Sequence, residues 1–188
     1  MNVFVILLRG INVGGKNIVP MVGLKRCLED LGFAHVSTHI ASGNVLLASD
    51  KPADEIRSRI EAAVTRSFKL DSELIKVLVL SRSHLQAVID HKPKGFGEQP
   101  EKYHSDAIFL IDIDAAQAMP IFSPREGVDT VRPGDGLIYS QRLSAERTKS
   151  RLSKVMGSPL YKSMTIRSWG TTTTLLDMLK GMDADKGA

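Results

Sequence analysis

Long apolar runs alternate with amphipathic stretches over the first 80 residues of the chain. The uninterrupted apolar residues at 2–8 are typical of a strand that is buried on both faces. Two later stretches carry apolar residues at helical spacing, and each begins at a proline, which is tolerated in the first helical turn. The pattern predicts a strand at 2–8, a helix from Pro20 to Leu31, strands at 35–40 and 44–49, a helix from Pro52 to Phe68 and a strand at 74–80.

A similar order recurs in the second half of the chain, after a helix at 82–91 and the Gly/Pro/Lys-rich stretch KPKGFGEQPEK. We expect strands at 107–112, 127–131, 137–142 and 164–168, and helices at 114–119, 144–156 and 172–181. The βαββαβ order is typical of ferredoxin-like folds. The sequence therefore predicts an α+β protein with two ferredoxin-like halves side by side, at 1–91 and 106–188, joined by a linker or long loop at 92–105, with an extra C-terminal helix.

The composition excludes several classes of protein. The single cysteine, Cys27, precludes an internal disulfide and favours a reducing, cytoplasmic environment. Its place on the apolar stripe of a predicted helix indicates a core residue rather than a nucleophile. The apolar run at 3–8 is too short to span a bilayer, and no signal-peptide pattern surrounds it. None of the five histidines has the spacing of a metal site, so we expect no metal. We also expect no cofactor, and the short apolar run leads us to expect no membrane partner.

The Gly/Asn-rich loop that follows the first strand is the most plausible place for function. Strands one and two of a βαββαβ unit run parallel, so this loop and the hairpin at 41–44 are expected at the same end of the sheet. Exposed backbone amides and the positive end of the next helix could hold an anion there. Alternatively, the glycines form a tight turn and the asparagines satisfy backbone groups. The candidate ligand-binding residues are Arg9, Asn12, Gly14, Gly15, Lys16, Asn17, Ser42 and Asn44.

The same loop nearly matches a nucleotide-binding P-loop. Gly10, Gly15 and Lys16 have the required spacing, but Asn17 stands where a hydroxyl side chain should bind magnesium. Pro20 delays the helix that should begin at the lysine, and the hairpin at 35–49 breaks the parallel order of a P-loop domain. We therefore expect no magnesium-dependent ATPase or GTPase activity.

The segments LLRGINVGGKN, VPM and SGNV resemble the signature of the bacterial family known as domain of unknown function 1697. The resemblance covers the whole chain. It implies ferredoxin-like halves, and it supplies no established activity, substrate or catalytic residue. Near the C-terminus, members of the family resemble RNWNT, whereas this chain has Ser168 and Gly170 in place of the two asparagines. Any role of those asparagines is in doubt here.

A local excess of basic residues lies near the C-terminus. Residues 141–168 contain seven Lys/Arg and one acidic residue, Glu146. Arg147, Arg151 and Lys154 share one face of the helix expected at 144–156. Together with Arg167 and Trp169 they form a candidate secondary surface for phosphate groups, the alternative being a solvated helix face. Trp169 itself is better interpreted as a core residue than as a base-stacking one.

Three functions remain compatible with the sequence. The chain could be a binding module for a phosphate-bearing ligand, either a nucleotide, a phosphate or a nucleic acid, that uses the 9–17 loop. It could be an enzyme acting on a small phosphorylated substrate, with Arg9 and Lys16 as electrophilic groups. It could also be a protein–protein interaction module whose loop is purely structural. The sequence does not determine the ligand or the oligomeric state.

Overall fold

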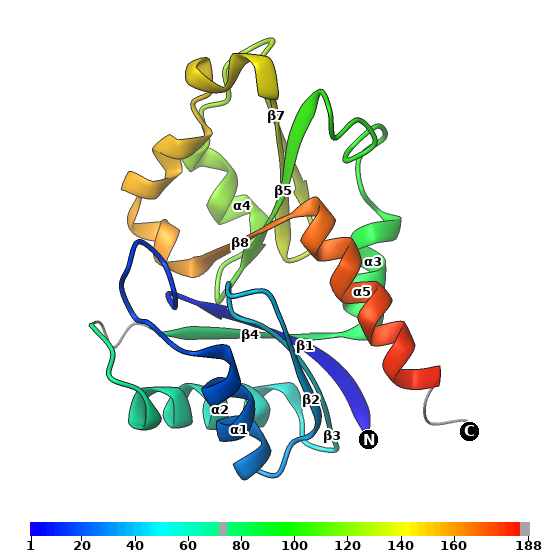
Figure 1. Ribbon diagram of the computed structural model, residues 1–188. Coiled ribbons are helices and arrows are strands. Elements are labelled where there is room, and N and C mark those ends of the chain that lie inside the picture. Colours follow the sequence, from blue (N-terminus) through cyan, green and yellow to red (C-terminus); the bar gives the residue numbers. More distant parts are fainter. Residues whose placement is uncertain (72–74, 185–188) are drawn as a thin grey trace. The chain divides into compact units, whose positions relative to one another are not determined.

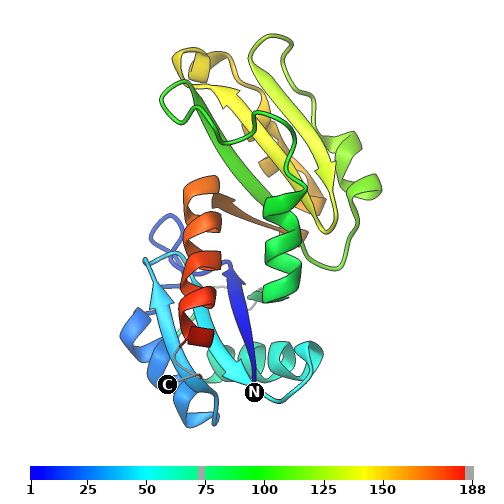
Figure 2. The same ribbon diagram turned by 90° about the vertical axis from the view of Figure 1, so that its right-hand side faces the viewer.

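The computed structural model describes residues 1–71 and 75–184, and the chain forms two compact units. Unit 1 comprises Met1–Gln86 together with the chain from Leu175 onward, and unit 2 comprises Ala87–Thr174. The sequence placed the division in a linker at 92–105 and assigned the C-terminal helix to the second half. The difference arises because two helices, α3 (Arg82–Asp90) and α5 (Trp169–Ala184), each run across a boundary between units. Figure 2 shows α5 as one continuous helix.

Unit 1 is built on a four-stranded antiparallel sheet with the order β2-β3-β1-β4 (Figure 1). The strands are β1 (Asn2–Arg9), β2 (Ala34–His39), β3 (Asn44–Ser49) and β4 (Lys76–Ser81), and the helices are α1 (Met21–Asp30) and α2 (Ala53–Ser67). β1 is central and pairs with both β3 and β4. The strand at 2–8 and its neighbours at 35–40 and 44–49 were thus predicted to within a residue or so.

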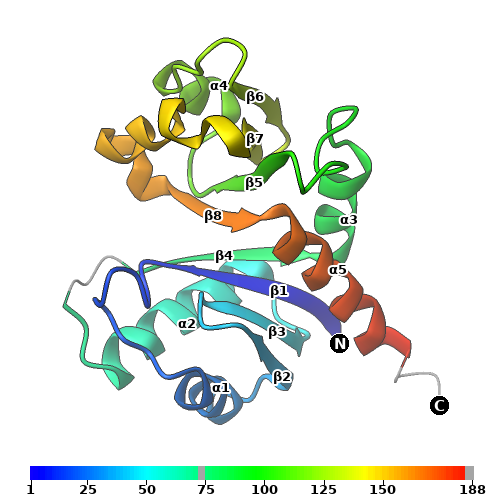
Figure 3. The same cartoon turned by 45° about the horizontal axis from the view of Figure 1, so that its top comes forward.

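Both faces of β1 are buried, which explains its uninterrupted apolar sequence. Phe4, Ile6 and Leu8 pack in one core with the buried residues of α1 and α2, which cover the same face of the sheet (Figure 3). The alternate residues Val5 and Leu7 are also fully buried. Burial of both faces is the reason that no polar position interrupts the run.

Cys27 departs from the expectation of a core residue. Leu24 and Leu28 form the buried stripe of α1, while Cys27 is half-buried at the edge of a groove between α1 and α2. Its Sγ lies 3.6 Å from the hydroxyl oxygen of Ser67. On this helix the buried position falls at Leu28, and its neighbour Cys27 lies at the edge of the buried stripe.

Unit 2 contains a second four-stranded antiparallel sheet, with the order β6-β7-β5-β8. Its strands are β5 (Tyr103–Leu110), β6 (Asp129–Gly134), β7 (Leu137–Leu143) and β8 (Met164–Ser168). A four-residue helix, α4 (Ala115–Ala118), and four 3₁₀ helices lie between the strands: η1 (Met119–Ile121), η2 (Ser144–Lys149), η3 (Leu152–Gly157) and η4 (Pro159–Ser163). The expectation of an α+β protein is confirmed.

The α-helix expected at 144–156 is wrong. The segment forms η2 and η3, with bonds between residues three apart, such as Ser150 N to Arg147 O and Lys154 N to Arg151 O. The backbone amide of Arg151 donates instead to the Asp129 carboxylate, at 2.8 Å. This long-range bond removes Arg151 N from an i→i−4 ladder, and such an interruption ends regular helix.

The two faces of the second sheet carry different packing. One face holds an aliphatic core that includes Ile108, Ile138, Leu152 and Val155. An aromatic cluster contains Phe96, Tyr139 and Trp169, with ring centroids 5.0–6.2 Å apart and edge-to-face geometry. The interpretation of Trp169 as a core residue is thereby confirmed. Among the described residues, no helix has the length and apolar character needed to cross a membrane.

Candidate functional site

The loop after β1 and the turn between β2 and β3 lie together, as the crossover argument predicted. Leu8 N donates to Gly43 O at 2.8 Å, and Asn12 Nδ2 donates to Ala41 O at 2.9 Å. Gly43 has a positive φ of 77°, and a Cβ there would come within 2.9 Å of Leu8 O. The glycine of the SGN turn is therefore required by the close approach of two backbones.

Asn12 uses its whole side-chain amide to join three segments. Its Nδ2 donates to Val19 O at 3.0 Å as well as to Ala41 O, and its Oδ1 accepts from Val19 N at 2.8 Å. Its φ of 54° is in the left-handed region, which asparagine tolerates better than most residues. Asn12 therefore ties the end of the loop to the start of α1 and to the β2–β3 turn.

Asn17 and Asp71 hold each other by reciprocal bonds. Asn17 N donates to Asp71 Oδ2, and Asp71 N donates to Asn17 Oδ1, both at 2.7 Å. Asn17 Nδ2 donates to Gly10 O at 2.7 Å. The side chain is buried, so Asn17 fastens the loop to the connection between α2 and β4.

Asn44 has a comparable role at the β2–β3 turn. It is fully buried, and its Nδ2 donates to His39 O and to the Ser42 hydroxyl. Asn12, Asn17 and Asn44 thus all satisfy protein groups. Their side chains are engaged as the alternative expectation described, in which the loop asparagines satisfy backbone groups.

The exposed part of the loop is a two-residue turn. Val13 and Lys16 form an antiparallel bridge, with Lys16 N donating to Val13 O at 3.0 Å. Gly14 and Gly15 between them have φ values of 58° and 75°, as a type I′ turn requires at both central positions. Lys16 is exposed and Arg9 is half-buried. Lys16 therefore stands at the end of an exposed two-residue turn.

The geometry differs from that of a P-loop. Lys16 lies at the end of the exposed turn, and α1 begins only at Met21, after Pro20 as its N-cap. β1 is flanked by two antiparallel neighbours. The near match of Gly10, Gly15 and Lys16 to the nucleotide-binding pattern is therefore a coincidence of spacing.

Exposed aliphatic side chains border the Asn12 junction, by which we mean Asn12 and the residues that its side chain contacts, Val19, Met21 and Ala41. Val13, Ile18, Val22 and Ile40 are 66%, 58%, 84% and 55% exposed, respectively. Each is the chain neighbour of a residue in the junction: Asn12 itself, Val19, Met21 or Ala41. The sequence did not single them out, because an isolated aliphatic residue in a polar loop carries no periodic signal.

A sequence profile of the family described as "Protein of unknown function (DUF1697)" matches residues 1–139. The chain belongs to this family. The solved structure of the conserved bacterial protein SP0830 from Streptococcus pneumoniae is similar, with a TM-score of 0.76 and 24% sequence identity over 95% of this chain and 98% of that chain. This likeness extends to the fold alone. A comparison with curated proteins gives no match.

The second candidate surface of this DUF1697 chain has fewer members than expected. Arg147, Arg151 and Lys154 are exposed, but they do not share one face of an α-helix: Arg147 lies in η2, Lys154 lies in η3, and Arg151 is the N-cap between them. Arg167 and Trp169 are only 7% and 8% exposed, so they cannot belong to an open surface. Arg167 Nη1 donates to Thr165 Oγ1 and Ile166 O, and burial lowers the pKa of its guanidinium to about 10.

Asp129 anchors the basic segment. Its Oδ2 accepts from the backbone amides of Arg125 at 2.9 Å and Arg151 at 2.8 Å. Burial acts to raise the pKa of Asp129, but these amides and the Ser150 hydroxyl outweigh it and hold the pKa below its ordinary value. The other oxygen, Oδ1, is buried and accepts no hydrogen bond within the described part of the chain.

The sequence also missed a polar cluster around β5. His104 Nε2 lies 3.1 Å from Asp106 Oδ2, and Ser168 of β8 is the register partner of Asp106. Burial raises the pKa of Asp106, against the opposing charges of His104 and Arg142. A cavity of about 400 Å³ is lined by residues that include His104, Ser168 and Trp169. The i,i+2 spacing of His104 and Asp106 on a strand was the available signal.

Proposed function

We propose that this DUF1697 protein binds a nucleic acid at a basic surface of unit 2. The observation that carries the proposal is the charge of the η2–η3 segment. Residues 141–168 hold seven basic residues against one acid, and that acid, Glu146, is paired with Lys149 at 2.5 Å. The exposed cations Arg147, Arg151, Lys154 and Lys162, which we call the basic surface, are left to meet an anionic partner.

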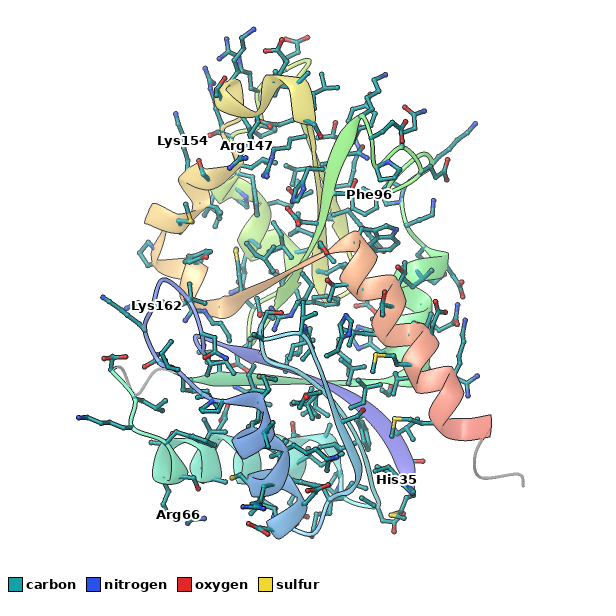
Figure 4. All side chains as sticks on the ribbon, in the orientation of Figure 1. His35, Arg66, Phe96, Arg147, Lys154 and Lys162 are labelled. Carbon is teal, nitrogen blue, oxygen red and sulfur yellow. The ribbon has the colours of Figure 1, made fainter. Side chains whose placement is uncertain are left out.

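The 3₁₀ geometry supports a regular array of these cations. Side chains three residues apart eclipse each other in a 3₁₀ helix, about 6 Å apart along the axis. Leu152 and Val155 are buried at that spacing, while Lys154 and the N-cap residue Arg151 are exposed and are joined by the bond from Lys154 N to Arg151 O. Figure 4 labels Arg147 and Lys154 close together and Lys162 lower on the same side of the view. Such a row suits the evenly spaced phosphates of one strand.

Salt dependence tests the proposal. We expect a short single-stranded oligonucleotide to bind with an affinity that falls steeply with salt, by a log–log slope of about 0.7 per phosphate contacted. The double variant Arg151→Ala/Lys154→Ala should lower the magnitude of that slope by about 1.4. Lys180→Ala, which removes an exposed cation outside this surface, serves as the matched control. Fluorescence anisotropy measures both. No binding at low salt by the folded protein would refute the function.

The Gly/Asn-rich loop at 9–17, which we call the signature loop, is the second candidate site. Exposed aliphatic residues in and beside it favour recognition of another protein. Val13, Ile18, Val22 and Ile40 offer apolar contacts beside the Lys16 cation, which suits an apolar segment carrying a carboxylate. A photo-crosslinking residue at position 18 should trap one partner, and the same residue at the exposed Ser58 of α2 should not. Equal trapping at both positions would refute this role.

A phosphate-binding role for the loop would use the exposed Gly14, Gly15 and Lys16, because Arg9 is half-buried and the Ser42 hydroxyl accepts from Asn44 Nδ2. Asn12, Asn17 and Asn44 already have protein partners for their amides. Pyrophosphate should raise the melting temperature of the native protein and not that of Lys16→Ala, because a ligand that binds the folded state stabilises it. An equal rise in both proteins would place the anion elsewhere.

We also propose that each unit has a ferredoxin-like fold. The two sheets share one strand order, in which the first strand lies between the third and the fourth. All neighbouring strands are antiparallel in both. This order, with an α-helical or 3₁₀ connection after the first and third strands, supports the class for both units.

A further inference from the structure

We propose that the cavity of unit 2 accepts one unstacked nucleobase of the bound nucleic acid. This base pocket measures about 400 Å³ and is lined by residues that include Pro100, Tyr103, His104, Ser105, Trp169 and Thr173. Its volume lies in the range of small-molecule sites, which combine apolar walls with a few polar groups. The base pocket deepens the proposed function, and the choice of a nucleobase as occupant rests on that function.

The lining of the base pocket includes ring side chains, which suit a planar ligand. They are Pro100, Tyr103 and Trp169. The Trp169 ring packs edge-to-face against Phe96, at a centroid distance of 5.0 Å, and against Tyr139, at 6.2 Å. Such a fixed side needs little ordering when a ligand binds, and the half-buried Tyr103, rather than the nearly covered Trp169, is the ring on which a base would stack.

The polar groups of the pocket offer both donors and acceptors. The Ser105 hydroxyl accepts from Gln141 Nε2 at 3.0 Å, so its own hydrogen is available to donate. Thr173 Oγ1 donates to Gly170 O at 2.9 Å, which leaves its lone pairs to accept. His104, whose Nε2 lies 3.1 Å from Asp106 Oδ2, borders the pocket from the opposite face of β5 to Ser105. The edge of a nucleobase presents the complementary mixture.

The strand register connects the pocket to the basic surface. His104 is the partner of Arg142 on β7, and Arg142 is the partner of Asp129 on β6. Asp129 in turn holds the backbone of Arg151. This row crosses two strand spacings, about 10 Å. On the other side, Lys102 Nζ lies 5.1 Å from the centre of the Tyr103 ring. The row through Arg142 lies on the His104 face of the sheet, and Lys102 places a cation beside the Tyr103 ring on the other face, where a phosphate of a bound strand would run.

Gly170 provides a direct way to close the pocket. It lines the cavity within α5, and a Cβ added there meets no atom within 4 Å. A leucine at this position should occupy the cavity without disturbing the fold, because leucine is a better helix former than glycine.

Trp169 is the only tryptophan of the chain, so its fluorescence reports on the base pocket alone. Adenosine, guanosine, cytidine and uridine are titrated separately, with correction for nucleoside absorbance. We expect saturable quenching by at least one nucleoside, no quenching of Gly170→Leu, and binding weakened about fivefold or more in Tyr103→Ala through the loss of stacking. His104→Ala provides an independent second variant and should also weaken binding. Melting curves verify that each variant is folded.

The outcomes separate the base pocket from the basic surface, because nucleosides carry no phosphate. Salt-dependent oligonucleotide binding without any nucleoside response would overturn the base pocket and leave the proposed function intact. Saturable nucleoside binding without oligonucleotide binding would support the pocket and overturn the function. Quenching that persists unchanged in Gly170→Leu, or in both Tyr103→Ala and His104→Ala, would also overturn the pocket.

Discussion

Asparagine side chains organise the signature loop because one amide can match both a backbone N–H and a backbone C=O. Asn12 does this with Val19, and Asn17 accepts from one backbone amide and donates to one carbonyl. Aspartate could not donate, and serine could not reach both groups. A motif rich in asparagine and glycine is therefore explained by the shape of the backbone before any ligand is invoked.

Asn12→Ala should destabilise the protein by about 3 kcal/mol. Three hydrogen bonds are lost at about 1 kcal/mol each or somewhat less, and alanine is strained at the positive φ of this position. Asn12→Gly loses the same bonds without the strain, so it should cost about 1 kcal/mol less. Urea unfolding measures both variants, with the exposed Lys16→Ala as the control. Equal stability of Asn12→Ala and wild type would contradict the structural role.

Gly97→Ala should be far more damaging than Gly95→Ala. Both glycines have a similar positive φ, 74° and 78°. A Cβ at Gly97 would lie 2.2 Å from Cδ1 of the buried Trp169 ring, whereas a Cβ at Gly95 meets nothing within 4 Å. Backbone strain alone costs about 1 kcal/mol, and overpacking adds about 1–3 kcal/mol. Thermal melts together with the Trp169 emission spectrum test this, and similar losses in both variants would exclude the clash.

At the scale of elements, the basic segment depends on a single carboxylate from another strand. Asp129→Asn should destabilise the protein by about 2 kcal/mol at pH 7, because bonds from backbone amides to a charged acceptor are weakened. The pKa of Asp129 is lowered from 3.8 in the folded state, so its stabilising effect is present above pH 3.8 and is lost as the pH falls through the lowered value. Urea unfolding at several pH values measures the gap between variant and wild type.

The difference in unfolding free energy between Asp129→Asn and wild type should therefore become smaller toward acid pH. Asp135→Asn, which changes an exposed carboxylate in the β6–β7 turn, is the matched control and should leave stability almost unaltered. A pH-independent difference between Asp129→Asn and wild type would show that the charge is not what holds the segment.

The element pattern was predictable where local sequence decides it. β1 and β3 were located closely because buried apolar runs leave few alternatives. The segment 144–156 was mispredicted because its apolar residues Leu152 and Val155 are three apart, a spacing shared by α- and 3₁₀-helices. The hydrogen bond from Arg151 N to Asp129 decides the local structure. It joins residues 22 apart, so the sequence around position 151 carries no signal of it.

The candidate site was predictable in location and less so in chemistry. Strand topology placed the loop beside the 41–44 turn correctly, because the crossover fixes which loops share a sheet end. The partner of Asn17 is Asp71, 54 residues away, so the sequence could not show that the amide was already engaged. For the same reason Arg167 was taken as a surface cation, although the fold buries it.

At the scale of the whole molecule, unit 1 includes the end of the chain. A fragment of residues 1–91, the half expected from the sequence, lacks the buried Leu175, Leu176 and Leu179. Each contributes about 2 kcal/mol on burial, so their combined loss is comparable with the stability of a small domain. We expect this fragment to bind the dye ANS and to melt without a sharp transition.

A chimera in which residues 175–184 follow Gln86 through a flexible Gly/Ser linker should regain cooperative melting. It restores the three leucines without the rest of unit 2. Cooperative melting of the 1–91 fragment at the temperature of the intact protein would contradict the division into these two units. Differential scanning calorimetry distinguishes the two results.

The chain has one cysteine and one tryptophan, and the fold places them in different units. Cys27 is half-buried on α1 in unit 1, and Trp169 stands in the aromatic cluster of unit 2. A coumarin attached to the thiol can accept excitation energy from the indole, with an efficiency that falls steeply with distance. The unaltered sequence thus contains a spectroscopic ruler between its two units, readable in solution before and after a nucleic acid is added.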